Sequence, residues 1–133
     1  MIEPYIIKFP KIGNQDFGFL SLAEKEFLPF IPKRIYWTYK TPENIVRGNH
    51  SHYELEQILV AVAGDIKIKI INSKGNEFDY LLDSPDMGVY IPKQCWRTLI
   101  FSKNAVLMSI ASIEYSESDY IRNFDEFKKQ IKK

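Results

Sequence analysis

Residues 47–70 read RGNHSHYELEQILVAVAGDIKIKI, and this stretch indicates a protein built from short β-strands. Residues 55–63 are apolar at nearly every position, as expected of a strand buried on both faces. Gly64 and Asp65 then form a hairpin turn signal. Isoleucine and lysine alternate over residues 66–70, which predicts a strand with its isoleucines facing the core and its lysines facing solvent.

The same pattern of short apolar runs and turn residues continues along most of the chain. Further strands are predicted at residues 5–9, 17–22, 33–39, 78–82, 88–91, 96–101 and 106–113, with turns at 13–16, 41–44 and 72–76. Tyr120, Phe124, Phe127 and Ile131 instead recur at helical spacing, which predicts a short C-terminal helix within residues 116–131. The expected fold is all-β, a sandwich or barrel of antiparallel strands followed by this helix.

Composition narrows the class of protein. A chain of 133 residues fits a single domain, here 1–133, and a net charge of +1 gives no field that would attract nucleic acid or an acidic membrane. The lone Cys95 excludes an internal disulfide and suits a reduced thiol in the cytoplasm. The sequence shows neither the features of a signal peptide nor an apolar run as long as a membrane span.

The chain has 2 histidines, His50 and His52, and they stand two residues apart. In a strand their side chains point to the same face. Imidazole exchanges protons readily near neutral pH and also binds metals. Three interpretations are possible: two metal ligands, a general base with its partner, or a plain pair of surface or hydrogen-bonded histidines.

The histidine pair lies in a segment that is similar to the first conserved motif of the cupins. The matching residues are Gly48, His50, His52, Gln57 and Gly64. The second cupin motif resembles residues 88–97, with its proline at Pro92. The resemblance implies a jelly-roll barrel of antiparallel strands with the histidines inside.

Two departures from the cupin pattern argue against a metal. Arg97 stands where cupins have a third histidine, and Gln57 stands where they have a glutamate. Arginine has no lone pair to offer, and its fixed charge repels a cation. Glu56 is adjacent, but strand alternation aims it at the opposite face. We therefore predict a site without metal or other cofactor.

Three segments sharpen the resemblance to the sugar nucleotide 3,4-ketoisomerases, which are small cupins acting on thymidine-diphosphate (dTDP) 4-keto-6-deoxyglucose. The segments are residues 47–57, 82–92 and 115–127. The resemblance implies an isomerase that makes a dTDP-3-keto-6-deoxyhexose by proton transfer through an enediol or enediolate, for deoxyaminosugar biosynthesis. It also implies a homodimer, in which the N-terminal strands within residues 1–30 are exchanged between subunits.

The resemblance also assigns the proton chemistry. His50 matches the family's base, which takes the proton from C3 of the sugar. His52 is then a relay, an acid, or the group that holds His50 in one tautomer. Tyr36, on a preceding strand, is a candidate proton donor or orienting hydroxyl.

Substrate binding is predicted for five further residues. Arginine binds phosphate with paired donors, so Arg34 and Arg47 are candidates for the diphosphate. Trp37 is a candidate platform for the thymine ring. Gln57 and Arg97 could donate to the sugar oxygens that gain negative charge.

Other functions remain open on the sequence alone. A 3,5-epimerase of the same substrate class would use a histidine base and leave the ketone at C4. A non-catalytic sugar-nucleotide-binding module would bind the ligand without exchanging its protons. A small-molecule sensor attached to another protein is disfavoured, since no extra domain is visible in the sequence.

Overall fold

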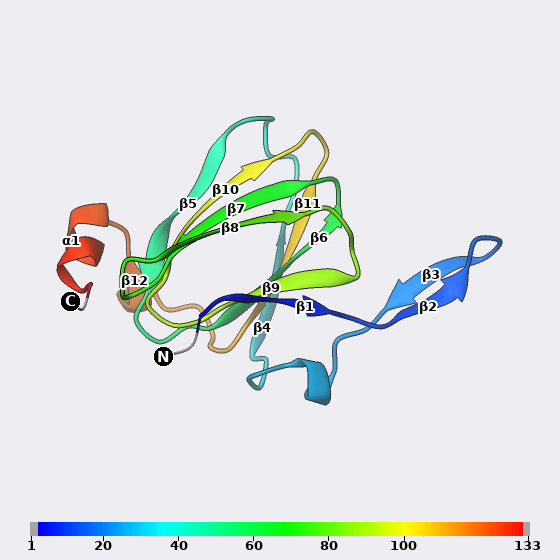
Figure 1. The fold of residues 1–133 in the computed structure, drawn as a ribbon, viewed down its shortest axis with the longest axis horizontal. Helices are drawn as coiled ribbons and strands as arrows, with labels where there is room; N and C mark the ends of the chain where they lie inside the picture. The colour runs from blue at the N-terminus through cyan, green and yellow to red at the C-terminus, as the bar shows by residue number, and fades with distance from the viewer. Residues whose placement is uncertain (1–2, 132–133) are drawn as a thin grey trace.

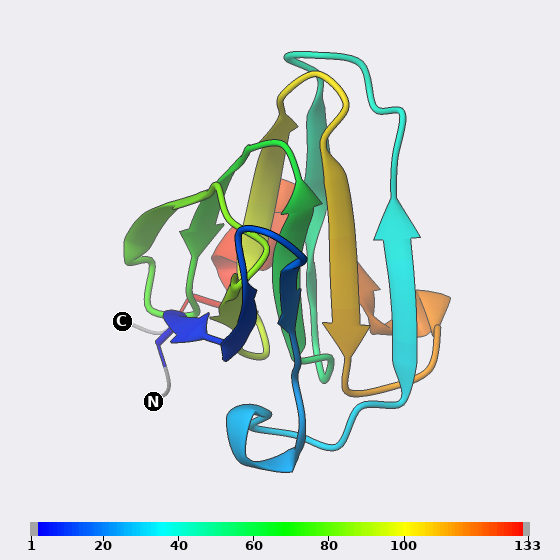
Figure 2. The same ribbon diagram turned by 90° about the vertical axis from the view of Figure 1, so that its right-hand side faces the viewer.

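Two five-stranded antiparallel sheets form the body of the protein in the computed structural model, which describes residues 3–131 (Figures 1 and 2). Residues 1–2 and 132–133, at the ends of the predicted domain, lie outside the described residues. The first sheet has the order β1 (Tyr5–Lys8), β9 (Met87–Ile91), β6 (Gln57–Ala63), β11 (Val106–Ala111) and β4 (Arg34–Thr38). The second has the order β12 (Tyr120–Ile121), β5 (Val46–His52), β10 (Trp96–Phe101), β7 (Ile66–Ile71) and β8 (Glu77–Leu82).

Shorter segments complete the fold. The strands β2 (Lys11–Asn14) and β3 (Gly18–Ser21) pair with each other. There are two 3-10 helices among the described residues, η1 (Lys25–Phe27) and η2 (Glu117–Asp119). The α-helix α1 spans Phe124–Lys129. The prediction of an all-β antiparallel fold with one short C-terminal helix is confirmed for the described residues. No helix among residues 3–131 has the length and hydropathy that crossing a bilayer requires.

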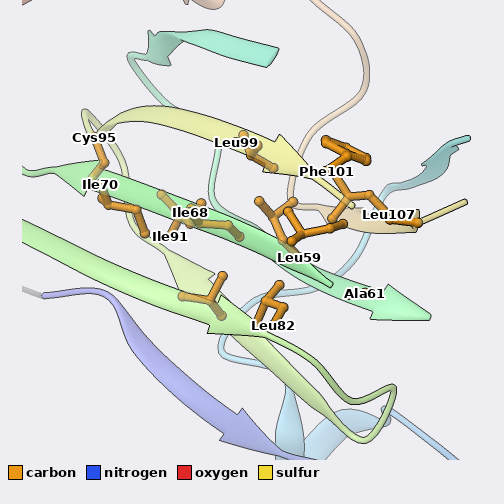
Figure 3. Packing of buried hydrophobic residues seen from close by; sticks show 13 residues of the cluster. Leu59, Ala61, Ile68, Ile70, Leu82, Ile91, Cys95, Leu99, Phe101 and Leu107 are labelled. Atoms are coloured by element: carbon orange, nitrogen blue, oxygen red, sulfur yellow. The ribbon is translucent and has the colours of Figure 1, made fainter. Parts of the chain in front are cut away.

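The main core lies between the two sheets (Figure 3). Strand alternation places Ile66, Ile68 and Ile70 inside with 0–1% of their surface exposed, while Lys67 and Lys69 face solvent. These isoleucines pack with side chains of the opposite sheet, which include Leu59, Ala61 and Leu107. The sequence prediction for this strand is therefore confirmed.

The connection at Gly64 differs from the prediction. Gly64 and Asp65 do not close a hairpin, because β6 and β7 belong to different sheets. The backbone of Asp65 instead bonds to Ser102, whose amide and hydroxyl lie 2.9 Å from the Asp65 carbonyl and amide. Gly64 has φ +69, and a Cβ here would come within 2.7 Å of Ala105. The turn thus carries the chain from one sheet to the other.

The predicted helix over residues 116–131 is too long. Tyr120 and Ile121 form a strand that pairs with His52 and Ser51 of β5. The α-helix begins only after Asn123, whose side chain accepts a hydrogen bond from the amide of Glu126 at 3.0 Å. The helical spacing was misleading because tertiary pairing and a strong N-cap decide where this helix starts.

The N-terminal hairpin of β2 and β3 projects away from the barrel (Figure 1). Its turn follows Asn14 rather than occupying residues 13–16 as predicted, and the Asn14 side chain accepts from two amides, those of Asp16 and Phe17, at 3.0 Å. Every residue of both strands is exposed. The hairpin therefore gains little burial within its own chain.

Candidate active site

A cavity of about 290 Å³ lies between the sheets, with walls from β4, β5, β6, β10, β11 and β12. Its lining residues are Tyr36, Thr38, Arg47, Gly48, His50, Gln57, Leu59, Arg97, Leu99, Phe101, Leu107, Ser109, Tyr120 and Arg122. The apolar members form part of the wall, and the polar members come from strands far apart in sequence. Nine of the fourteen lining residues carry polar side chains, so the cavity suits a polar small molecule.

A local break in β5 positions His50. Gly48 has φ +86 and Asn49 has φ 54, and the pairing with β10 shifts register between Arg97 and Thr98. A Cβ on Gly48 would lie 2.8 Å from the Arg97 carbonyl oxygen, so the close approach of the strands requires glycine. His50 Nδ1 lies 3.0 Å from the Gly48 carbonyl oxygen. A neutral His50 therefore donates through Nδ1 and keeps a lone pair on Nε2.

His52 lies deeper, with 1% of its surface exposed. The two imidazole rings are 4.9 Å apart and nearly perpendicular, which confirms that they share one face of the strand. His52 Nδ1 lies 3.2 Å from Asp119 Oδ2, and the same carboxylate accepts from the amides of Glu54 at 2.8 Å and Leu55 at 3.1 Å. Asp119 is therefore held in place and fixes the ring of His52.

Arg97 is a buried cation beside the histidine pair. It is 1% exposed and lies directly across from His50 in the pairing of β10 with β5. Its Nε and Nη2 donate to the Cys95 carbonyl at 3.3 and 3.1 Å, and its Nη1 donates to Gln57 Oε1. Among residues 3–131 it forms no ion pair. Arg97 therefore faces the interior of the protein and lines the cavity.

Burial and this cation keep both histidines neutral at physiological pH. Burial lowers the pKa of His50 to about 4, and the charge of Arg97 acts in the same direction. Burial first, then Arg97 and His50, lower the pKa of His52 to about 2. The neutral ring of His52 donates from Nδ1 to the Asp119 carboxylate. Both rings can therefore accept protons through Nε2.

Gln57 connects Arg97 to Tyr36. Its Nε2 lies 2.5 Å from the Tyr36 hydroxyl, and its Oε1 accepts from Arg97. Glu56 points away from the cavity, as strand alternation predicted, and accepts from the Tyr90 hydroxyl at 2.6 Å. Burial is the main reason why the pKa of Tyr90 lies above its ordinary value, and the Glu56 hydrogen bond adds to it.

The other predicted contacts divide into three cases. Arg47 lines the cavity and is exposed at its rim. Arg34 lies next to Tyr36, with its guanidinium 4.8 Å from that ring's centroid. Trp37 is 63% exposed on the opposite face of β4, because Tyr36 and Thr38 occupy the inward positions of the strand. Trp37 is therefore not part of the cavity of its own chain.

Sequence reasoning did not place three residues at the site, namely Asp119, Tyr120 and Arg122. Tyr120 contacts both histidine rings. Its ring centroid lies 5.1 Å from that of His50 and 4.3 Å from that of His52. Arg122 lines the cavity and its guanidinium lies 4.0 Å from the Tyr120 ring centroid. All three residues lie in segment 115–127, which resembles the ketoisomerases and could have pointed to them. Because this segment was predicted to be helical, the pairing of β12 with β5 was not expected.

Comparisons with known proteins agree with this architecture. A TDP-4-oxo-6-deoxy-alpha-D-glucose-3,4-oxoisomerase from Aneurinibacillus thermoaerophilus is 37% identical over 134 residues, covering 99% of this chain and 95% of that protein. The crystal structure of QdtA, a sugar 3,4-ketoisomerase from Thermoanaerobacterium thermosaccharolyticum, in complex with TDP superposes with a TM-score of 0.90. It is 35% identical, covering 96% of this chain and 93% of that chain.

A QdtA variant with one histidine replaced by asparagine has been solved in complex with TDP-4-keto-6-deoxyglucose. It is 34% identical to this chain, with a TM-score of 0.91 and coverage of 98% of this chain and 95% of that chain. The fold is thus that of the cupin-like sugar isomerases, as predicted.

The family model described as "FdtA: WxcM-like, C-terminal" matches residues 3–132. The chain therefore belongs to this family, and its predicted resemblance to the sugar nucleotide 3,4-ketoisomerases is confirmed.

The lowered histidine pKa values predict how stability depends on pH. An unfolded histidine has a pKa of about 6.5, so the unfolded chain takes up protons before the folded chain does as the pH falls. The free energy of unfolding is expected to decrease from pH 6.5 down to about 4 through His50, and further through His52. The slope is at most about 1.4 kcal/mol per pH unit for each histidine. Denaturant unfolding at several pH values measures it.

The control is the His50→Asn variant, which should lose one histidine's share of that slope. NMR titration of the wild type should show both imidazoles neutral at pH 6. An imidazole of the folded protein that is half protonated near pH 6.5 would contradict the assignment.

Proposed function

We propose that this chain is a 3,4-ketoisomerase that converts dTDP-4-keto-6-deoxyglucose to a dTDP-3-keto-6-deoxyhexose. The observation that carries the proposal is the position of His50, which lines the cavity beside the buried His52, donates through Nδ1 to Gly48 and keeps Nε2 free. A base of this kind suits removal of a proton from a carbon beside a ketone. The family's named members supply the substrate class.

In the proposed reaction His50 Nε2 takes the proton from C3 of the sugar. The C–H electron pair forms a double bond between C3 and C4, and the carbonyl π pair moves to the C4 oxygen. The C4 oxygen gains a proton, the C3 hydroxyl loses one, and C4 receives the proton that completes the product. Relative to the substrate, the product has lost one hydrogen from C3 and one from O3 and has gained one at C4 and one at O4.

Fixed charge and fixed donors stabilise the enediolate. The Arg97 guanidinium is buried beside His50 and has no carboxylate partner within the described residues, so its field is available to a developing oxyanion. His52 is a positioning residue in this proposal. Its ring contacts His50 edge to face and is itself anchored by Asp119.

The size of the cavity indicates which part of the nucleotide sugar would bind inside it. Ligand pockets commonly measure about 300–1,000 Å³, so 290 Å³ suits a hexose rather than a whole nucleotide sugar. The diphosphate would then lie at the rim, where Arg47 and Arg122 are exposed and Arg34 is close by. Arginine matches phosphate through paired donors.

The first test follows the ketone. Wild-type protein in deuterated water should move the ketone from C4 to C3, with deuterium entering at C4, as followed by NMR of the product. The His50→Asn variant should fold normally and lose about 100-fold to 10,000-fold in kcat, because it removes the base.

Two outcomes would contradict this function. Exchange at C3 and C5 with the ketone retained at C4 would indicate a 3,5-epimerase. Binding of the nucleotide sugar that raises the melting temperature without any exchange would indicate a non-catalytic binding module.

We also propose that the reaction needs no metal. Arg97 occupies the position that the resemblance assigns to a third histidine ligand, and its charge disfavours a cation between the imidazoles. Dialysis against a strong chelator should leave kcat unchanged within about twofold. A loss of activity that one divalent ion restores would contradict metal independence.

A homodimer with exchanged N-terminal strands is the proposed assembly. The β2–β3 hairpin pairs with no other strand in the described chain, and an isolated hairpin is marginally stable at best. Apolar side chains are exposed on it and on the outer face of the edge strand β4. They include Ile12, Phe19, Leu20, Ile35 and Trp37, and Tyr39 is exposed just after the end of β4. A second copy of the chain would cover both surfaces.

A reducing, cytoplasmic location would suit the free thiol of Cys95.

The dimer prediction uses matched charge insertions. Trp37→Glu should shift the protein from dimer to monomer, because it places a charge in the proposed interface. Leu81→Glu is the control, since Leu81 is 46% exposed on β8 of the other sheet. Sedimentation velocity measures both. A wild-type monomer, or two variants that both stay dimeric, would contradict the proposal.

A further inference from the structure

A continuous chain of hydrogen bonds runs from Arg97 through Gln57 to Tyr36. Arg97 Nη1 donates to Gln57 Oε1, and Gln57 Nε2 donates to the Tyr36 hydroxyl at 2.5 Å. Arg97 and Gln57 are 1% and 2% exposed, so water does not compete strongly for these contacts. The three residues come from β10, β6 and β4, which lie in both sheets.

The chemistry of arginine fixes the direction of every bond in this chain. A guanidinium can only donate, so Arg97 must face the oxygen of the Gln57 amide. The amide nitrogen must then face Tyr36, and because an amide NH₂ cannot accept, the Tyr36 oxygen is the acceptor there. The hydroxyl proton of Tyr36 is thereby turned away from Gln57. Within residues 3–131 no protein group accepts that proton, and Tyr36 lines the cavity together with His50.

We propose that Gln57 is a positioning residue that commits the Tyr36 hydroxyl to donate into the cavity. This inference rests on the proposed ketoisomerase function. When His50 removes the proton beside the ketone, the carbonyl π pair moves onto oxygen, and a donor fixed in advance stabilises that oxyanion. The Tyr36 O–H bond stays intact in this step. Gln57 acts through Tyr36 and need not touch the substrate.

The decisive variant is Gln57→Glu, which keeps the shape of the side chain and reverses one hydrogen bond. A carboxylate accepts from Arg97 and also from Tyr36, so the Tyr36 proton turns toward residue 57 and away from the substrate. The new ion pair with Arg97 should leave the melting temperature unchanged or higher. TDP affinity should be retained, because the nucleotide lies outside the cavity in the proposed complex. We expect kcat to fall by about 100-fold or more.

Gln57→Met is the matched comparison. It leaves Arg97 Nη1 without its acceptor, so the melting temperature should fall, but the Tyr36 hydroxyl stays free to rotate and donate to the substrate. We expect Gln57→Met to be less stable than Gln57→Glu and yet to retain more activity. If the activities of the two variants follow their stabilities instead, Gln57 has only a structural role and the proposal is wrong.

Gln57→Glu changes both the direction of the hydrogen bond to Tyr36 and the charge of the site. Repeating the substitution in a Tyr36→Phe variant separates these two effects on kcat. With Tyr36→Phe there is no hydroxyl to redirect, so the loss of kcat on adding Gln57→Glu reports only the compensation of the Arg97 charge, and it should be at least about tenfold smaller than the loss in the wild-type background. An equal loss of kcat from Gln57→Glu in both backgrounds would assign the effect to charge and overturn the proposal. A wild-type protein that leaves the ketone at C4 would instead reject the proposed function itself, and the inference with it.

Discussion

The buried guanidinium of Arg97 is the constraint on which the site depends. A charge with 1% exposure costs free energy unless hydrogen bonds replace its water, and here they come from the Cys95 carbonyl and the Gln57 amide oxygen. Both acceptors are neutral, so the positive field is not cancelled. That field helps to keep His50 and His52 unprotonated. Because a guanidinium can only donate, Arg97 also fixes the orientation of the Gln57 amide. One buried cation thus prepares a base and a hydrogen-bond donor in the same cavity.

Strand geometry brings these groups together from distant parts of the chain. Side chains alternate along each strand, so Tyr36 on β4, His50 on β5 and Gln57 on β6 face the same interior, while Trp37 and Glu56 face away. The return of the chain at β12 closes one side of the cavity. It adds Tyr120 and, through the adjacent η2, the carboxylate that anchors His52. Residues 47–57 alone therefore supply only part of the site.

Local periodicity and residue chemistry were enough to predict several features of the fold and the site. The alternation over residues 66–70, the shared face of the histidine pair and the outward direction of Glu56 all depend on a period of two, and the structure has them. The errors arose where long-range pairing decides. Gly64 lies in the turn between two sheets, where a Cβ would clash with Ala105, and Tyr120 pairs with β5 although its spacing to Phe124 and Phe127 suits a helix. Such long-range contacts cannot be predicted from the pattern of a short sequence window.

Arg97 and Arg122, two of the three arginines that line the cavity, show how the same side chain serves opposite purposes. Arg122 is half exposed at the rim and forms two hydrogen bonds with Glu117, at 2.7 and 2.9 Å, so its charge is largely compensated before any ligand arrives. Arg97 is buried and meets neutral acceptors only. A carboxylate beside Arg97 would make the folded chain more stable but would cancel the field in which an oxyanion forms. The neutral amide at Gln57 therefore favours stabilisation of an anionic intermediate over stabilisation of the empty protein.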